Sequence, residues 1–405
     1  MSEWRKVRLV DIASNIQTGP FGSQLHQSDY SELGTPVVMP KDLVNGHISE
    51  QAIARVSNRH TERLKKHKII PGDIIYSRRG DVGRCAFAFD NNAGWLCGTG
   101  CLLVRIDTNK AIPKFVFYEL QLDESIGWVV NHAIGSTMLN LNTTILSNVP
   151  VRITNLKTQD KICDILSTYD DLIENNNRQI KLLEEAAQRL YKEWFVDLHF
   201  PGYENCEIVD GVPEGWRRYS LENVIKFNPK MSFKKDSKKI SVPMASLNTS
   251  CMVLDKTHFV QTTSNSGSKF KNGDTLLARI TPCLENGKTG FAYGLPEEGA
   301  VGSTEFIVMR SKLLNPYMVY LFARTDSFRR YAINSMTGSD GRQRAQVDKL
   351  RQLCYILPEK NIIESFGMTV EPLFKEIYVL QNQSSRATEA RDRLLPKLMS
   401  GEIEV

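Results

Sequence analysis

The sequence repeats itself, and this repetition limits the folds that the chain can adopt more than any other feature does. Residues 71–78 read PGDIIYSR, and residues 272–279 read NGDTLLAR. Further along, residues 97–99 read CGT before an apolar run, and residues 301–303 read VGS before another. A unit of roughly 200 residues is therefore written twice within the 405 residues, which predicts two similar domains.

Each copy begins with a part that mixes strand and helix signals. Short apolar runs such as 35–39 and 102–106 lie between turns rich in Gly, Asn and Asp, as is typical of strands. The segments 113–122 and 316–331 start with proline, which favours the first turn of a helix. We therefore expect a mixed α+β fold with two similar α/β globular domains.

The second part of each copy carries apolar residues at alternating steps of four and three. In the first copy these positions are Ile162, Leu166, Tyr169, Ile173, Asn176, Ile180, Leu183, Ala187, Leu190 and Trp194. In the second copy they are Phe366, Val370, Leu373, Ile377, Leu380, Ser384, Ala387, Arg391, Leu394 and Leu398. A seam sustained over more than four heptads predicts a long coiled-coil helix in each copy.

The two helices are predicted to pair antiparallel about an internal pseudo-two-fold axis, because neither can bury its apolar stripe alone. This pairing would place Asn176 and Ile180 opposite residues 377–384. Asn176 and Ser384 interrupt the seam near its middle, where they either set the register or are simply tolerated. The expected order is a globular domain at 1–152, a spacer helix at 153–200, a second globular domain at 201–358 and a second spacer helix at 359–405.

Composition points to a cytoplasmic protein without a membrane partner. No apolar run approaches the roughly 20 residues that cross a bilayer, and the first residues lead into no signal-type stretch. The eight cysteines form no CxxC pair, so no metal site is predicted. The net charge of +5 is compatible with a polyanionic partner.

Three catalytic motifs that the sequence imitates are incomplete. A nuclease of the PD-(D/E)xK type needs Glu and Lys soon after its Asp, but neither follows Asp73 until Lys110. Pro282 stands where a P-loop needs its first glycine. Asn315 begins a sequence that lacks the second proline of an amino-methyltransferase motif. The chain therefore carries no recognisable catalytic apparatus.

Basic and amide-bearing residues gather at turns of both copies, where rigid strands can present them to a ligand. Arginine suits guanine edges, asparagine and glutamine suit adenine edges, and lysine suits phosphates. Arg78 and Arg279 stand out because both follow a Gly-Asp strand at matched positions. The predicted DNA-contacting residues are Gln24, Lys41, Arg78, Arg79, Arg84, Ser136, Asn140, Ser246, Asn248, Lys269, Arg279, Arg342 and Arg344.

The duplicated layout, the Gly-Asp strand motif and the closing run DRLLPKLMSGEI at residues 392–403 resemble the specificity (S) subunits of type I restriction-modification systems. The resemblance covers essentially the whole chain, although the first-copy counterpart of the closing run, residues 190–195, is degenerate. It implies that the two globular segments are target recognition domains, each reading one half of a bipartite site in double-stranded DNA. The helices would fix the gap between the halves and dock the modification subunits.

The same resemblance implies a non-catalytic subunit of a complex that acts as a type I site-specific deoxyribonuclease and adenine-specific DNA methyltransferase. The expected partners are two methyltransferase (M) subunits, which use S-adenosylmethionine, and restriction (R) subunits, which use ATP and Mg²⁺. No cofactor would be bound by this chain. Two other interpretations stay open: a stand-alone DNA methyltransferase or nuclease with unrecognised motifs, and a coiled-coil scaffold without a DNA role.

Overall fold

The computed structural model describes residues 4–405 apart from Ser136, Lys235 and Asp340. It contains two compact units. Unit 1 comprises Met1–Asp171 and Ala387–Val405, and unit 2 comprises Leu172–Arg386. None of the helices in the described part of the chain is long and apolar enough to cross a membrane.

Unit 1 is built on two four-stranded sheets and two short strand pairs. The first sheet has the order β2 (Ala13–Thr18), β11 (Cys101–Ile106), β8 (Ile74–Ser77), β9 (Cys85–Phe87), and it is antiparallel throughout. The second has the order β10 (Leu96–Cys97), β4 (Thr35–Val38), β7 (Ala54–Val56), β3 (Tyr30–Ser31). The pairs are β1 (Arg5–Arg8) with β12 (Pro150–Ile153), and β5 (Leu43–Val44) with β6 (His47–Ile48). The short helices are α1 (Leu9–Ile12), α2 (Asn58–Arg63), α3 (Pro113–Leu120), α4 (Asp123–His132) and α5 (Thr143–Ser147).

Unit 2 repeats the first sheet of unit 1 strand for strand. Its order is β16 (Ile225–Phe227), β23 (Phe306–Ser311), β20 (Thr275–Ala278), β21 (Thr289–Phe291), again antiparallel. The second sheet has the order β18 (Val260–Thr262), β17 (Lys239–Val242), β22 (Ala300–Gly302), β19 (Ser268–Phe270). The remaining elements are β13 (Ile208–Val209), β14 (Val212–Pro213), β15 (Arg217–Ser220), β24 (Cys354–Leu357), α7 (Leu221–Val224), α8 (Pro316–Ala323), α9 (Asp326–Asn334) and α10 (Val347–Gln352). The predicted mixed α+β fold with an internal repeat is confirmed.

The aspartate of each Gly-Asp motif is a buried structural residue. In unit 1, Asp73 accepts hydrogen bonds from Arg105 Nε at 2.8 Å, Arg105 Nη2 at 2.7 Å and the backbone N of Ile70 at 2.8 Å. In unit 2, Asp274 accepts from Arg310 Nε at 2.7 Å and Nη2 at 2.6 Å. The aspartate therefore links the turn before β8 or β20 to the neighbouring strand, β11 or β23. This shared structural role explains why the motif recurs in both copies.

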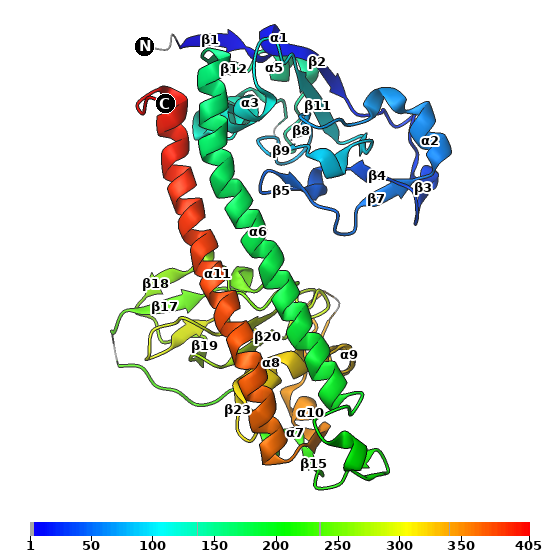
Figure 1. Cartoon of the computed structure of the whole chain (residues 1–405), viewed down its shortest axis with the longest axis vertical. Helices are drawn as coiled ribbons and strands as arrows, with labels where there is room; N and C mark the ends of the chain where they lie inside the picture. The colour runs from blue at the N-terminus through cyan, green and yellow to red at the C-terminus, as the bar shows by residue number, and fades with distance from the viewer. Residues whose placement is uncertain (1–3, 136, 235, 340) are drawn as a thin grey trace. The chain divides into compact units, whose positions relative to one another are not determined.

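Two long helices contribute residues to both units: α6 (Leu156–Phe195) and α11 (Lys360–Ser400). Within unit 2 they lie side by side and antiparallel (Figure 1). Near the end of α6, Trp194 packs on Phe366, which lies near the start of α11, with ring centroids 5.4 Å apart. Earlier in α6, Asn176 Nδ2 donates to Gln383 Oε1, late in α11, at 3.1 Å. The antiparallel pairing predicted from the heptads is therefore present, with helices slightly shorter than expected.

Most of the predicted seam is buried within its own unit. Leu166 in unit 1 and Ile180, Val370, Ile377 and Leu380 in unit 2 are buried, whereas Ile173 and Leu183 are half-buried. Asn176 is buried too, and its hydrogen bond to Gln383 gives this polar position a partner across the seam. Ser384 is half-buried, and its hydroxyl has no hydrogen-bond partner among the described residues. Of the two interruptions, Asn176 is the one with the geometry of a register-setting residue.

A tyrosine anchors α6 to the globular part of each unit. In unit 1, the Tyr118 hydroxyl of α3 donates to Asp170 at 2.5 Å, and Asp170 also binds Arg391 Nη1 of α11 at 2.9 Å. In unit 2, Glu184 of α6 accepts from the Tyr320 hydroxyl of α8. Burial raises the pKa of Glu184, and Tyr320 and Arg324 oppose that rise. Both tyrosines come from the helix that begins with proline, so the repeat extends to this contact.

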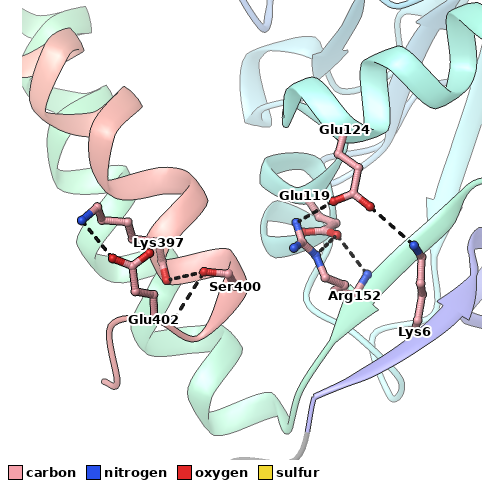
Figure 2. Close-up of polar contacts among 7 residues, drawn as sticks. All are labelled: Lys6, Glu119, Glu124, Arg152, Lys397, Ser400 and Glu402. Atoms are coloured by element: carbon pink, nitrogen blue, oxygen red, sulfur yellow. Dashed lines mark hydrogen bonds and ion pairs between the residues drawn. The ribbon is translucent and has the colours of Figure 1, made fainter.

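In unit 1 a buried carboxylate also fastens the strand that leads into α6. Glu119 accepts from the backbone N of Arg152 at 3.0 Å and from Arg152 Nε at 2.9 Å. Arg152 Nη2 lies 3.7 Å from Glu124. Figure 2 shows this group together with the end of α11, where Lys397 contacts Glu402 at 3.0 Å. Burial raises the pKa of Glu119, although Arg152 favours its charged form.

Candidate nucleic-acid interface

In unit 1, Arg78 lies where a strand end and two turns meet. It follows β8 directly, and its backbone N donates to the Gly100 carbonyl, just before β11, at 2.9 Å. Its own carbonyl accepts from Leu141 N at 2.8 Å. The neighbouring Asn140 closes a hairpin through reciprocal backbone hydrogen bonds with Ile134 at 2.7 and 3.0 Å. We call Arg78, Gly100 and Asn140 corner 1.

Corner 1 holds polar atoms that the fold leaves without partners. Arg78 Nε and Asn140 Oδ1 are both buried, and neither has a hydrogen-bond partner within the described part of the chain. Buried polar atoms are normally paired, so these two unpaired atoms set corner 1 apart from the rest of the unit. The chemistry of an arginine fork beside a side-chain amide matches base edges and phosphates alike.

An exposed aromatic ring lies beside corner 1. The Arg78 guanidinium carbon is 6.0 Å from the ring centroid of Phe21, a residue that is 55% exposed. Gln24 belongs to the same turn, and its Oε1 accepts from the backbone N of Phe21 at 3.2 Å. Sequence reasoning selected Gln24 and Arg78 but missed Phe21. The signal that could have identified it is an aromatic residue between Pro20 and Gly22, within a turn where burial is unexpected.

The other predicted DNA-contacting residues of unit 1 differ in whether their side chains already have partners within the protein. Arg79 is exposed and forms an isolated β-bridge with Asn140. Arg84 is exposed but pairs with Asp81 at 2.8 Å, and Lys41 Nζ donates to the Ala52 carbonyl at 3.0 Å. Ser136 lies outside the described residues. Arg78, Arg79 and Asn140 are thus brought together, with Gln24 beside Phe21.

Unit 2 has an equivalent corner with different side chains. Arg279 follows β20, its backbone N donates to the Glu305 carbonyl at 2.9 Å, and its carbonyl accepts from Ala345 N at 2.8 Å. Arg344 occupies the hairpin position that Asn140 has in unit 1, since it pairs with Thr337 through backbone bonds of 2.9 and 3.1 Å. We call Arg279, Glu305 and Arg344 corner 2. Arg279 Nε, like Arg78 Nε, is buried without a partner among the described residues.

Arg344 forms a bidentate ion pair inside corner 2. Its Nε lies 3.0 Å from both carboxylate oxygens of Glu305, and its Nη2 lies 2.8 Å from Glu305 Oε1. The hydrogen bonds and charge of Arg344, with a further contribution from Arg279, hold the pKa of Glu305 below its usual range. Glu305 was not among the sequence-predicted residues, and no local motif distinguishes it from other acidic residues.

The remaining predicted DNA-contacting residues of unit 2 range from fully buried to exposed. Ser246 is fully buried, so its side chain cannot contact a ligand on the surface of the unit, and in this respect the prediction is wrong. Asn248 is exposed, with its Oδ1 accepting from Ser250 N at 2.9 Å. Lys269 Nζ lies 6.0 Å from the ring centroid of Phe233, and Arg342 is exposed next to corner 2. The sequence therefore located the arginines of corner 2 but misplaced Ser246.

Neither corner resembles a metal site. Among the residues that the structure describes, no cluster of three or more His, Cys, Asp or Glu side chains is arranged to hold a metal ion. What both corners offer is hydrogen-bonding and ionic recognition by side chains that rigid strand ends hold in place.

Comparisons with known proteins point in one direction. Residues 1–185 match the family described as Type I restriction modification DNA specificity domain. The Type I restriction enzyme MjaIX specificity subunit of Methanocaldococcus jannaschii is 24% identical over 91% of this chain and 87% of its own length. The Type I restriction enzyme HindI specificity subunit of Haemophilus influenzae is 22% identical over the full length of both chains.

A solved structure shares the fold. The S subunit of a Type-I restriction-modification system from M. genitalium matches with a TM-score of 0.57. The match has 14% sequence identity and covers 98% of this chain and 96% of that chain. The similarity to the two specificity subunits reaches beyond the 185 residues of the family match and covers 91% and 100% of this chain.

Proposed function

Since the chain belongs to the family of type I restriction-modification specificity subunits, we propose that it reads a bipartite site in double-stranded DNA, one half-site for each unit. The observation that carries this proposal is the pair of matched corners. Both present an arginine directly after the matched strand, β8 or β20, and hold its backbone through two equivalent hydrogen bonds. Two copies of one reader suit two half-sites.

The side chains around corner 1 have the chemistry of base and backbone readout. Arg78 can offer a fork to a guanine edge or a phosphate, and Asn140 can pair with an adenine edge. Phe21 adds an exposed ring on which an apolar contact with a base or sugar can form. Each reader alone would bind modestly, and linking the two makes the second engagement intramolecular.

We further propose that α6 and α11 fix the gap between the half-sites and dock the methyltransferase subunits. Paired helices are stiff, and both contribute residues to each unit. Leu182 of α6 and Met368 and Val379 of α11 are large apolar residues that stay exposed on the helices. Exposed apolar side chains on a paired helix are suited to a protein partner.

By the same reasoning the chain supplies DNA sequence recognition to the complex and carries out no catalytic step. The methyltransferase subunits would use S-adenosylmethionine, and restriction subunits would use ATP and Mg²⁺, so this chain would bind none of the three. The cytoplasm is the compartment in which such a complex would meet DNA.

The decisive experiment is to map methylated adenines in DNA treated with the full chain and its methyltransferase subunits. The proposal predicts two short specific sequences separated by a constant non-specific gap. A continuous motif, or methylation without sequence preference, would contradict it.

Two controls separate the alternatives. Methyl transfer or cleavage by the purified chain alone would support a stand-alone enzyme. Failure to shift duplex DNA even with the methyltransferase subunits present would support a scaffold without a DNA role.

A further inference from the structure

The two corners share a backbone frame but differ at one position. The backbone carbonyl of Gly100 in corner 1 accepts a hydrogen bond from the backbone N of Arg78. The backbone carbonyl of Glu305 in corner 2 accepts the equivalent bond from Arg279. A Cβ on Gly100 would lie 2.8 Å from Pro40 Cδ, so unit 1 leaves no room for a side chain there. Unit 2 places a carboxylate at the same point of its frame.

The Glu305 carboxylate is held by Arg344, and it can still accept a further hydrogen bond. Arg344 donates to both carboxylate oxygens, but Oε1 receives two of the three hydrogen bonds and Oε2 only one. The Glu305 side chain is 24% exposed, so it is not sealed inside the unit. The backbone N of Glu305 donates to Ser303 Oγ at 3.2 Å, which fixes the base of the side chain. The result is a preoriented acceptor next to the backbone hydrogen bonds that hold Arg279, which unit 1 shares at Arg78.

We propose that Glu305 is a specificity-determining residue of the unit 2 reader, and that it accepts a hydrogen bond from the N4 amino group of a cytosine. This inference rests on the proposed function and names one base contact within it. A carboxylate can only accept hydrogen bonds when it is ionised. In the major groove cytosine presents an amino donor, whereas guanine presents two acceptors that would repel the carboxylate.

Adenine fits this acceptor less well than cytosine does. Its N6 amino group is a donor, but N7 beside it is an acceptor facing the same groove. The lowered pKa keeps Glu305 charged at neutral pH, so the repulsion from N7 persists there. Arg344 then acts as a positioning residue that aims Glu305, which differs from the direct DNA contact predicted for Arg344 from the sequence.

Corner 1 provides the contrast. Asn140 stands at the position of Arg344, its Oδ1 is buried without a partner among the described residues, and no carboxylate is present. The half-site read by unit 1 therefore serves as an internal reference. A change confined to corner 2 should leave it unaltered.

The test uses the full chain assembled with its methyltransferase subunits and a library of random duplexes, from which the bound motif is determined. Glu305→Gln is expected to reduce the preference for cytosine at one position of one half-site by about tenfold, and to shift it toward adenine, because an amide pairs with N6 and N7 together. Glu305→Asp, which keeps the charge, is expected to keep cytosine. Arg344→Ala is expected to alter that same position and no other.

Asp348→Asn is the matched control, because it removes one negative charge from an exposed acid of unit 2 that pairs with Arg351. It should leave the motif unchanged. The inference is overturned if Glu305→Gln selects the wild-type base with the wild-type preference, if Asp348→Asn produces the same change, or if Arg344→Ala changes a different position. A wild-type complex that selects no split motif would instead overturn the proposed function.

Hydrogen exchange of the β20 and β23 amides at the wild-type rate shows that unit 2 of each variant is folded. Should Glu305→Gln not fold, the comparison of Glu305→Asp with Arg344→Ala still decides the matter. Glu305→Asp must keep the preference for cytosine, and Arg344→Ala must lose it.

Discussion

Removal of Arg105 should destabilise unit 1 far more than removal of an exposed arginine does. Asp73 is fully buried, and two of its three hydrogen bonds come from Arg105. In Arg105→Ala the carboxylate would keep only the backbone N of Ile70. Breaking a buried ion pair costs about 3–5 kcal/mol because the remaining charge is uncompensated. The Arg105 side chain is 31% exposed, so water can partly replace it, and we expect about 3 kcal/mol.

Hydrogen exchange of the full chain measures this effect unit by unit. Amides of β8 and β11 should exchange roughly a hundredfold faster in Arg105→Ala, since 1.4 kcal/mol corresponds to a factor of ten. Those of β20 and β23 should be unaffected. Arg310→Ala should reverse the pattern, because Arg310 binds the buried Asp274 in unit 2.

The surface pair of Arg8 and Asp11 supplies the control. Both side chains are exposed, at 60% and 42%, so Arg8→Ala should leave the stability of unit 1 nearly unchanged. If Arg105→Ala accelerates exchange no more than Arg8→Ala, the buried pair contributes nothing of the expected size. The structural explanation for the recurrent Gly-Asp motif would then be wrong.

Three further predictions concern recognition and pH. Arg78→Ala should weaken only the half-site read by unit 1, by about 1–3 kcal/mol, in competition binding with DNA variants; an equal loss on every sequence would identify a phosphate contact instead. Four residues inserted between Asp171 and Leu172 of α6, at the boundary of the two units, add about 6 Å of helix and should lengthen the methylated motif's gap by about two base pairs; altered half-sites with an unaltered gap would refute the spacer proposal. Because Arg344 lowers the pKa of Glu305 in the folded state, their pair stabilises unit 2 above the unfolded pKa of about 4.3, and this contribution is lost as the pH falls through the folded value. Urea unfolding of Glu305→Gln should show a shallower loss of stability in that acidic range, and an unchanged slope would contradict the linkage.

The architecture was open to prediction because its signals are local and repeated. The heptads identified both long helices, and their spacing placed Asn176 opposite the segment around Gln383, as the structure has it. The recurrence of the Gly-Asp motif predicted matched strands, and the identical order of the β2 and β16 sheets confirms it. The boundaries of the recognition domains stay a prediction, since α6 and α11 contribute to both compact units.

Residue type and spacing along the chain are enough to predict a duplicated α+β protein, an antiparallel helix pair, and two arginines at equivalent strand ends, because periodic burial and turn chemistry act over a few residues. Which side chains surround those arginines was decided only by tertiary structure. Glu305 meets Arg344, and Phe21 meets Arg78, through sheets whose neighbouring strands are not consecutive in the sequence. The burial of Ser246 depends on the same packing. A side chain's partners and exposure follow from the contacts that folding brings together, and no local pattern encodes them.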